Sequence, residues 1–427
     1  MASVNYSYGD KYYASFSFRR DGSSRLSPDT RWGNFWSLSA SWRLSQEKFM
    51  QSLKSVLSDL KLRASYGVNG NLPSSYYGYQ STYTTGAFYN GKPSPWESTL
   101  GNEELTWEKN YALNLGLDIG LFSRVNVSLD WYTRTTKDLL MSKQLNSISG
   151  FSSLLTNVGQ MRNTGVELEV RSNNIKTKDF SWTTAFNLSH NKNKILKLAD
   201  LPWFVDGRYV RKEGYPFNTI YLREYAGVDP ETGSALYYDN QQDENGNYTK
   251  NKVTDPGQAS PIPLKDITPT ISGGFMNTFN YKFIDLSFNL SYSFGGYSYD
   301  NASYILQDDG YSVISNKSTE QRRRWQKPGD ITDVPRFVYG NKKGGNYNSS
   351  RAIHSTDHIR LKSLILGLNA PKAWLQKLGI GNARIYFSGT NLLTWAAYGQ
   401  YDPEMSGVVG FYTPPLKTYA FGLELKF

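Results

Sequence analysis

The sequence TYAFGLELKF, residues Thr418–Phe427, alternates strictly between two kinds of side chain. One face of the alternation is apolar and consists of Tyr419, Phe421, Leu423, Leu425 and Phe427. The other face carries Thr418, Ala420, Gly422, Glu424 and Lys426. A period of two predicts a β-strand that has one apolar and one polar surface.

The same alternation recurs along the chain in about thirteen segments, each near the ~10 residues of a tilted transmembrane strand. In one segment, Val125, Val127, Leu129 and Trp131 alternate with Asn126, Ser128, Asp130 and Tyr132. Others lie at 36–43, 111–119, 166–171, 182–189 and 284–294. Charged residues in these segments keep to the polar face, and a charge facing lipid would cost about 2–4 kcal/mol at mid-membrane. The pattern predicts an all-β fold, an antiparallel transmembrane β-barrel.

Composition differs from that of an ordinary globular domain and is compatible with a membrane barrel. Hydrophobic residues make up 39% of the 427 residues, below the usual ~45–50%. Aromatic residues reach 15%, with 32 Tyr and 11 Trp, and these side chains suit surfaces that are apolar at one end and wet at the other. The mean hydropathy is −0.55, and no run approaches the ~18 apolar residues of a membrane helix.

The connections between segments alternate in length. Short ones lie at 120–123, 173–179 and 282–283, and long ones at 67–105, 196–267 and 295–358. Short turns on one side and long extracellular loops on the other are typical of outer-membrane barrels. Within one turn, Phe49, Leu53, Val56, Leu57 and Leu60 have helical spacing. This spacing predicts a small amphipathic helix over Glu47–Leu60, with no role beyond filling the turn.

A set of ordered segments resembles the C-terminal barrel portion of SusC/RagA-type TonB-dependent outer-membrane transporters. The segments include FRRDGSSR (Phe18–Arg25), LKLRASYGVNGN (Leu60–Asn71), NVGQMRNTGVELEV (Asn157–Val170), GVDPETG (Gly227–Gly233), RWQKPGDITDVPRF (Arg324–Phe337), IYFSGTNLLTW (Ile385–Trp395) and YDPEMSG (Tyr401–Gly407). The resemblance implies a 22-stranded barrel, of which this chain would supply about thirteen strands. It also implies a place in the cell outer membrane, an N-terminal plug, and import of oligosaccharides or peptides.

The resemblance sets the expected partners and domain organisation. The expected partners are a SusD-like surface lipoprotein, outer-membrane lipid, an oligosaccharide or peptide substrate, and the TonB complex through an N-terminal part. We expect residues 1–427 to be the C-terminal part of the barrel, because no signal peptide, N-terminal extension or plug is recognised in the sequence. A fragment, a truncated gene product and one half of a split protein remain alternatives. The terminal strand is expected to be read by the barrel-assembly machinery through Tyr419, Phe421, Leu423, Leu425 and Phe427.

Aromatic residues concentrate in three long loops. We expect substrate or partner contacts from Tyr76, Tyr77, Tyr79 and Trp96, from Trp203, Tyr209 and Arg211, and from Tyr299 and Tyr347. Aromatic faces with neighbouring amides suit the capture of a sugar or a peptide. The alternative is that these side chains pack the loops.

The sequence predicts no catalytic residue, no cofactor and no metal site. Cysteine is absent, which excludes disulfides and thiolate metal sites. No nucleophile elbow, Walker loop or dinucleotide motif stands in a strand-to-helix context, so we expect no enzyme.

Two segments are considered as metal sites. His354 and His358 have an i, i+4 spacing that could bind metal on a helix, but a polar role in a loop is the better interpretation. Residues 239–247, DNQQDENGN, predict a hairpin turn, with opportunistic calcium as the alternative.

The formal net charge of +10 is compatible with several classes of anionic partner. Nucleic acid is excluded as a partner because no recognised binding motif accompanies the scattered cations. Anionic lipid head groups or an acidic ligand fit the charge better. A soluble or surface all-β ligand-binding or adhesion protein is the alternative function.

Overall fold

The computed structural model describes residues 1–198, 201–341, 348–371, 374–375 and 379–427. Within these ranges, thirteen strands form one sheet and follow one another in chain order. The chain folds as two compact units, Met1–Trp203 with Lys212–Pro216, and Phe204–Arg211 with Phe217–Phe427. No helix in the described ranges is long and apolar enough to cross a bilayer. The predicted all-β antiparallel fold with about thirteen long strands is confirmed.

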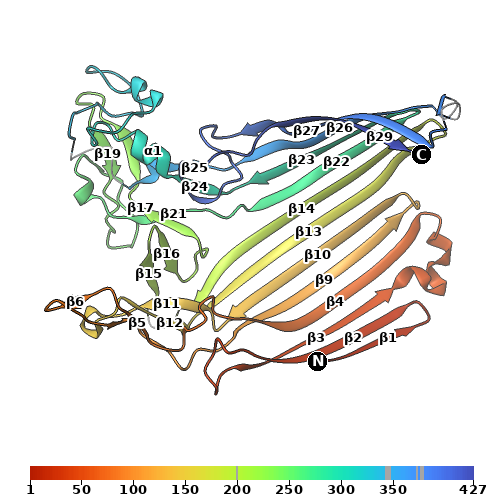
Figure 1. Cartoon of the computed structure of the whole chain (residues 1–427), viewed down its shortest axis with the longest axis horizontal. Coiled ribbons are helices and arrows are strands. Elements are labelled where there is room, and N and C mark those ends of the chain that lie inside the picture. Colours follow the sequence, from red (N-terminus) through yellow and green to blue (C-terminus); the bar gives the residue numbers. More distant parts are fainter. Residues whose placement is uncertain (199–200, 342–347, 372–373, 376–378) are drawn as a thin grey trace. The chain divides into compact units, whose positions relative to one another are not determined.

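The first unit contains eight of the long strands, which run side by side in Figure 1. They are β1 (Ala2–Tyr8), β2 (Tyr12–Gly22), β3 (Trp32–Arg43), β4 (Leu57–Asn71), β9 (Glu108–Leu121), β10 (Val125–Lys137), β13 (Gln160–Lys176) and β14 (Phe180–Lys197). Each pairs antiparallel with the next of the series. This meander places short turns at one end of the strands and long loops at the other.

The second unit contains the remaining five long strands. They are β22 (Ile271–Tyr281), β23 (Ile284–Phe294), β26 (His358–Asn369), β27 (Asn382–Ala396) and β29 (Thr418–Lys426). Their antiparallel registers are continuous apart from one irregularity between β23 and β26 and one between β26 and β27. The predicted turn at Lys282–Phe283 lies between β22 and β23.

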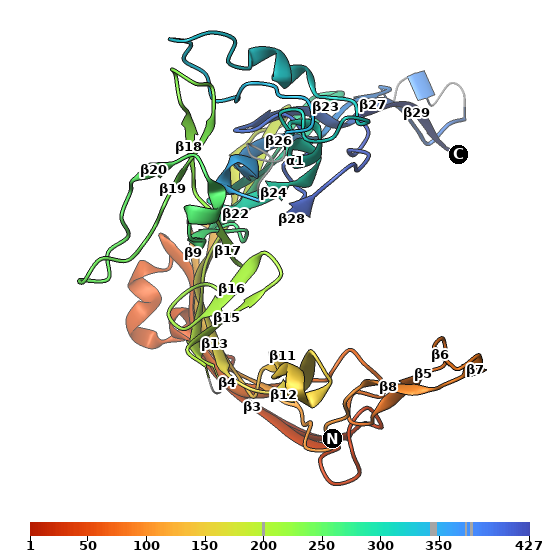
Figure 2. The same ribbon diagram turned by 90° about the vertical axis from the view of Figure 1, so that its left-hand side faces the viewer.

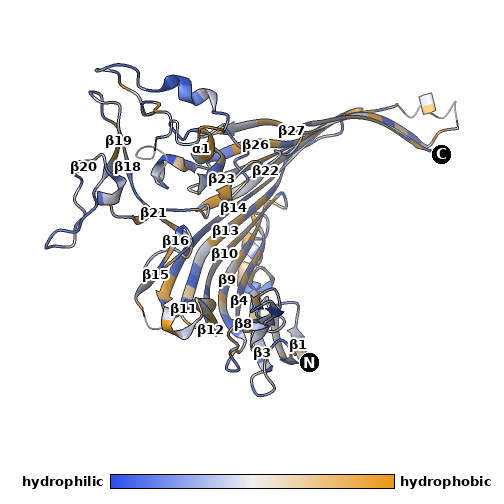
Figure 3. Cartoon of the chain, turned by 60° about the vertical axis from the view of Figure 1, so that its left-hand side comes forward, coloured by the Kyte–Doolittle hydropathy of each residue, from blue (hydrophilic) through white to orange (hydrophobic). Residues whose placement is uncertain are grey.

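The strand registers keep apolar residues beside apolar residues. Leu62, Leu117, Leu129 and Leu168 are successive cross-strand partners on β4, β9, β10 and β13. Leu62 is 42% exposed and Leu129 is 40% exposed, although both lie in the middle of a regular sheet. The alternation of apolar and polar residues is visible along the strands in Figure 3. An extended exposed apolar face needs a lipid or protein covering.

The predicted helix at Glu47–Leu60 is wrong. The turn holds two short 3₁₀ helices, η1 (Leu44–Gln46) and η2 (Lys48–Leu53), and β4 already begins at Leu57. Leu57 and Leu60 pair with Leu121 and Ile119 of β9, so strand pairing overrides their helical spacing. Glu47 accepts hydrogen bonds from the Tyr12 hydroxyl (2.7 Å) and the Lys11 Nζ (2.9 Å), which lower the pKa of its carboxyl to about 2.

The long loops carry secondary structure of their own. Their strands are β5 (Thr82–Thr84), β6 (Phe88–Tyr89), β7 (Lys92–Pro93), β8 (Trp96–Thr99), β11 (Leu140–Gln144), β12 (Ser153–Asn157), β15 (Trp203–Asp206), β16 (Tyr209–Lys212), β17 (Thr219–Leu222), β18 (Tyr225–Val228), β19 (Ala235–Tyr238), β20 (Lys252–Val253), β21 (Ile262–Asp266), β24 (Tyr297–Asp300), β25 (Ile353–Ser355) and β28 (Gly407–Val409). Their helices are α1 (Asn301–Leu306), η3 (Ser147–Ser149), η4 (Pro256–Gln258), η5 (Thr319–Arg323) and η6 (Ser350–Ala352). Figure 2 shows α1 near β24 and β28.

Conventional hydrophobic cores lie mainly in these loops. One cluster consists of Leu26, Phe35, Leu105 and Trp107 in the first unit. The second unit has two more clusters, one of Ile220, Leu222, Tyr299 and Ala352 and one of Ala235, Tyr237 and Ala259. The loops are therefore packed structures that can hold side chains in fixed positions.

Candidate functional site

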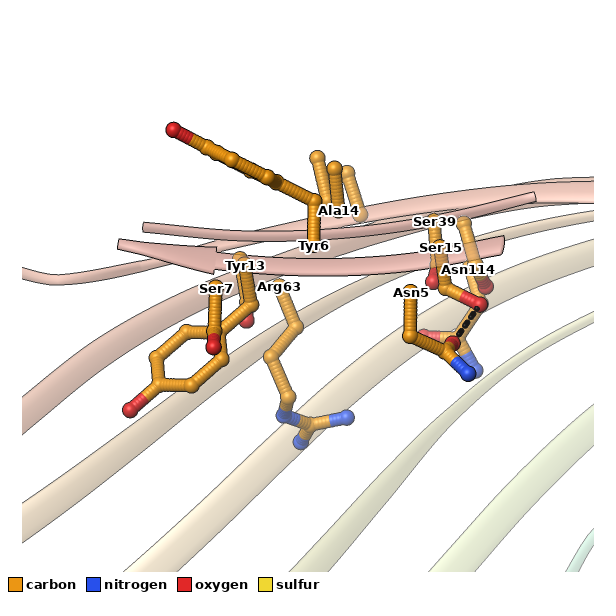
Figure 4. Close-up of a pocket in the computed structure, with 13 residues that line it drawn as sticks. Asn5, Tyr6, Ser7, Tyr13, Ala14, Ser15, Ser39, Arg63 and Asn114 are labelled. Atoms are coloured by element: carbon orange, nitrogen blue, oxygen red, sulfur yellow. Dashed lines mark hydrogen bonds between the residues drawn. The ribbon is translucent and has the colours of Figure 1, made fainter. Parts of the chain in front are cut away.

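The polar face of the first unit carries a row of small polar side chains. Asn5, Ser15, Ser39, Ser65 and Asn114 are successive cross-strand partners on β1, β2, β3, β4 and β9. They help to line an open hollow of about 440 Å³. Figure 4 shows Asn5 and Ser7 pointing to the opposite side of the strands from Tyr6, with the Ser15 hydroxyl donating to Asn5 Oδ1 at 2.7 Å. Such a surface offers many weak hydrogen-bonding groups and suits a hydrated interior.

An ion-pair network borders this row on the polar face. Arg63 donates from Nε to Asp118 Oδ2 (2.8 Å), from Nη1 to Asp130 Oδ1 (2.9 Å) and from Nη2 to Ser128 Oγ (3.0 Å). Arg63 lies on β4 and Asp130 on β10, so the side chain crosses the intervening strand β9. Their shared cross-strand partner on β9 is Gly116. A Cβ at this position would lie 2.5 Å from Arg63 Cζ, so glycine makes room for the ion pair.

The second unit repeats this arrangement. Arg384 of β27 donates from Nη2 to Asp285 Oδ2 of β23 at 2.6 Å, and the Asn369 amide donates to Asp285 Oδ1 at 2.8 Å. A Cβ on Gly367 of the intervening β26 would lie 2.5 Å from Asp285 Oδ1. On both polar faces, therefore, an ion pair joins two strands over a glycine of the strand between them.

The predicted aromatic residues of the first loop lie mostly at its surface. Tyr76 and Tyr77 are each 63% exposed, and Trp96 on β8 is 54% exposed. The Arg25 guanidinium lies 4.2 Å from the centre of the Tyr76 ring. Tyr79 is half-buried and packs against the cluster of Leu26, Phe35, Leu105 and Trp107. The loop therefore presents three aromatic faces and anchors itself with the fourth.

The predicted contacts in the later loops have different environments. Trp203 is 45% exposed, Tyr209 is half-buried, and Tyr299 is only 1% exposed. Arg211 is buried, donates to Asp206 Oδ2 at 2.9 Å, and lies 3.9 Å from the centre of the Phe217 ring. Burial lowers the pKa of Arg211 and raises the pKa values of Tyr209 and Tyr299. Arg211 and Tyr299 thus support the loops here, and their predicted ligand contact stays a prediction.

Tyr347 lies outside the described residues. The terminal strand, in contrast, is fully described and pairs antiparallel with β27, with Phe421 opposite Phe387 and Leu423 opposite Ile385. All five of its predicted apolar residues are exposed: Tyr419, Phe421, Leu423, Leu425 and Phe427. The strand therefore continues the apolar face of the second unit. Its recognition by an assembly machinery stays a prediction.

The residues considered as metal ligands are engaged elsewhere. His354 lies on β25 and stacks on Tyr398 with ring centres 3.7 Å apart, and the His358 Nδ1 lies 2.8 Å from the Thr356 carbonyl oxygen. Asp239 accepts from Asn251 Nδ2 at 2.8 Å, and Asp243 accepts from the backbone of Asn247 at 2.8 Å in a turn. Among the residues that the structure describes, no group of three His, Asp or Glu side chains could hold a metal ion.

A buried ionic cluster stabilises a loop of the second unit. The Asp309 side chain is fully buried and accepts from Arg351 Nη2 at 3.1 Å and from Gln321 Nε2 at 2.9 Å. The neighbouring Asp308 pairs with Lys317 at 2.6 Å. Sequence reasoning missed this cluster because its residues lie in segments that show no periodicity. The only available signal was two adjacent aspartates before a glycine, which is common in turns.

Comparison with known proteins places these features in a family. A family model described as TonB dependent receptor-like, beta-barrel matches residues 1–220. TonB-dependent receptor P3 of Formosa agariphila is 33% identical over 459 residues, which covers 99% of this chain and 45% of that protein. TonB-dependent receptor SusC of Bacteroides thetaiotaomicron is 30% identical over 453 residues, which covers 99% of this chain and 43% of that protein.

Solved structures agree with this comparison. The RagAB peptide transporter structure matches with a TM-score of 0.89 and 31% identity, covering 100% of this chain and 47% of the matched chain. The same importer in its open-open state matches with a TM-score of 0.87. This chain spans less than half the length of the relatives it matches.

Proposed function

Because the chain belongs to the TonB-dependent receptor-like β-barrel family, and so to the bacterial outer membrane, we propose that it forms the wall and extracellular loops of a nutrient importer. The proposed substrates are oligosaccharides or peptides. The proposed partner is a SusD-like surface lipoprotein that closes over the loops. The observation that supports this best is the similarity over the whole chain, at a TM-score of 0.89, to a peptide transporter.

The two faces of the strands support a transport wall. The apolar face exposes residues such as Leu115 (46%) and Ile385 (60%), which suits lipid contact. The polar face carries the Arg63 network and the hollow beside it. A hydrophilic solute passing along such a face exchanges hydrogen bonds with water for hydrogen bonds with Ser and Asn side chains. No chemical step is needed, in keeping with the absence of a recognised catalytic motif from the sequence.

The loops supply the proposed capture surface. Tyr76, Tyr77 and Trp96 are exposed on a loop whose base is fixed by a buried cluster. Aromatic faces of this kind stack on sugar rings or on peptide side chains, each contact contributing about 0.5–1.5 kcal/mol. The pairing of exposed aromatics with a rigid base lowers the entropy cost of capture.

We predict that replacing Tyr77 and Trp96 together by alanine weakens substrate capture about tenfold. The measurement is the uptake and binding of labelled oligosaccharides and peptides by cells that carry the intact transporter and its lipoprotein. The matched control is Ile148→Ala, since Ile148 is 92% exposed on another loop of the same unit but has no aromatic face. Unchanged binding in the double variant would contradict a capture role for these rings.

The same double variant separates substrate contact from partner contact. If the rings bind substrate, the lipoprotein should still co-purify with the variant transporter. Loss of the lipoprotein with unchanged substrate affinity for the assembled complex would assign the rings to the partner surface instead. Failure of every oligosaccharide and peptide to be taken up by the wild-type protein would overturn the proposed substrate classes.

Energy coupling, gating and barrel assembly are further parts of the proposal. Energy coupling to TonB and gating by a plug are proposed to reside in an N-terminal part, with residues 1–427 as the C-terminal barrel part. The terminal strand is proposed to guide barrel assembly. Membership of an outer-membrane family sets aside the alternative of a soluble adhesion protein.

A further inference from the structure

The apolar face of the first unit ends in a group of cations at the loop side. We call Lys109, Lys137, Arg162, Lys192 and Lys194 the basic strip. Register places them on the apolar face: Lys137 follows Leu129, Trp131 and Thr133 at a period of two on β10, and Lys192 follows Phe186 and Leu188 on β14. Lys137, Arg162, Lys192 and Lys194 are exposed. These charges therefore lie on the lipid side of the wall and not on the proposed transport side.

The strip lies at the level of a membrane surface. Lys192 is ten residues beyond Trp182, which lies with Phe180 at the turn end of the same face of β14. At about 3.3 Å per residue this is about 33 Å along the strand. A tilt of about 40° reduces it to about 25 Å along the membrane normal, the usual height of the apolar band. With Trp182 at one interface, Lys192 reaches the head groups of the opposite leaflet, on the side of the long loops.

Like charges face each other directly within the strip. Arg162 is the cross-strand partner of Lys194, and Lys137 is the cross-strand partner of Lys109. Directly opposed like charges destabilise a sheet pair. Arg162 Nε donates to Thr135 Oγ1 at 3.2 Å, and Lys137 lies 5.0 Å from the Tyr111 ring centre. In the described part of the chain, Lys109 has a distant carboxylate, Asp138 at 3.8 Å, whereas Arg162, Lys192 and Lys194 have no salt-bridge partner.

We propose that the basic strip binds the phosphate groups of lipid in the outer leaflet of the outer membrane. Phosphates between the facing cations would neutralise the repulsion of each opposed pair, and the lipid chains would lie against the apolar band below. Arg162 is suited to a bidentate phosphate contact, and the lysines act as point charges. This proposal rests on the outer-membrane location alone and does not depend on the transported substrate.

The test is the affinity of the intact purified transporter for diphosphoryl lipid A, measured by native mass spectrometry. Each cation near a membrane surface contributes about 1 kcal/mol, which is about fivefold in affinity. The double variant R162Q/K194Q should therefore bind about 30-fold more weakly than the wild type. The charge-retaining variant R162K/K194R should bind within about threefold of the wild type, since it keeps both point charges.

The matched control is K176Q/K178Q, which removes two exposed cations at the turn end of β13. Its lipid A affinity should not change. The proposal is overturned if this control loses as much affinity as R162Q/K194Q, if R162Q/K194Q loses none, or if lipid A without phosphates binds equally well. Unaltered heat-modifiable gel mobility of R162Q/K194Q shows that its barrel is intact, so a folding defect is distinguished from a lost site.

Discussion

Replacing Arg351 by methionine is expected to lower the free energy of unfolding of the second unit by about 3–5 kcal/mol. The substitution keeps much of the side-chain volume but removes the cation that pairs with Asp309, whose side chain is fully buried. An ionised carboxylate without its partner in such a place is the costly state of a buried pair. Denaturant unfolding of the intact protein and hydrogen exchange over residues 301–352 measure the effect.

The defect in this variant should depend on pH. Burial raises the pKa of Asp309 above its ordinary value even while Arg351 opposes the shift, so removal of Arg351 raises the pKa further. A folded-state pKa above the unfolded value of about 3.9 means that stability falls as pH rises between the two values. The deficit of R351M relative to wild type should thus be smaller at pH 5 than at pH 8.

Two control variants test whether the burial of the pair and the charge of Asp309 cause the loss of stability. Arg323 also pairs with carboxylates, Glu320 at 2.9 Å and Asp333 at 2.8 Å, but it is 61% exposed. Arg323→Met should therefore cost less than about 1 kcal/mol. Asp309→Asn in the R351M background should recover part of the loss, since it removes the unpaired charge. An R351M protein that is as stable as wild type at pH 8 would show that Asp309 is not held as an anion.

The fold could be predicted from sequence because lipid imposes a strict local rule. Residues such as Leu129 and Asp130 must point to opposite sides of a strand, and one misplaced charge costs several kcal/mol. The alternation therefore identifies each long strand without knowledge of its partners. Strand ends were predicted less well: β4 extends to Asn71, and β13 continues to Lys176, inside the segment expected as a turn.

The failed helix at Glu47–Leu60 has a different cause. Leu57 and Leu60 satisfy a helical spacing, but they also pair with β9 residues that are more than fifty positions away. A short helix is only marginally stable by itself, so its apolar spacing contributes less stability than backbone hydrogen bonds to an existing sheet. Local periodicity decides a structure only where no longer-range partner competes.

The candidate site was predictable in kind but not in detail. Composition indicated aromatic loops, and Tyr76, Tyr77 and Trp96 are indeed exposed. Composition gave no means of separating them from Tyr299, which fills a core, or from Arg211, which is buried beside Asp206. The Arg63 network was also missed, because its members are 55 and 67 residues apart. A glycine on the polar face of a strand, such as Gly116, is the local sequence signal for such a bridge.

Replacing Arg63 by methionine is expected to destabilise the first unit by about 2–3 kcal/mol. Loss of a buried ion-pair partner costs about 3–5 kcal/mol, and this figure is reduced because Arg63 and Asp118 each keep 32% of their side-chain surface exposed. The change leaves Asp118 and Asp130 as neighbouring carboxylates that repel each other across β9 and β10. Urea unfolding of the protein in lipid bilayers, followed by tryptophan fluorescence, measures the loss.

Neutralising the two carboxylates tests whether charge is the cause. D118N/D130N in the R63M background should recover most of the lost stability, because the asparagines can hydrogen-bond to each other and to Ser128 without net charge. Arg171→Met on the same polar face is the control, since Arg171 is 72% exposed and pairs only with Glu169 of its own strand in the described structure. It should change the free energy of unfolding by less than about 0.5 kcal/mol. If R63M and R171M were equally stable, the ionic bridge over Gly116 would be a surface contact with no part in holding the wall together.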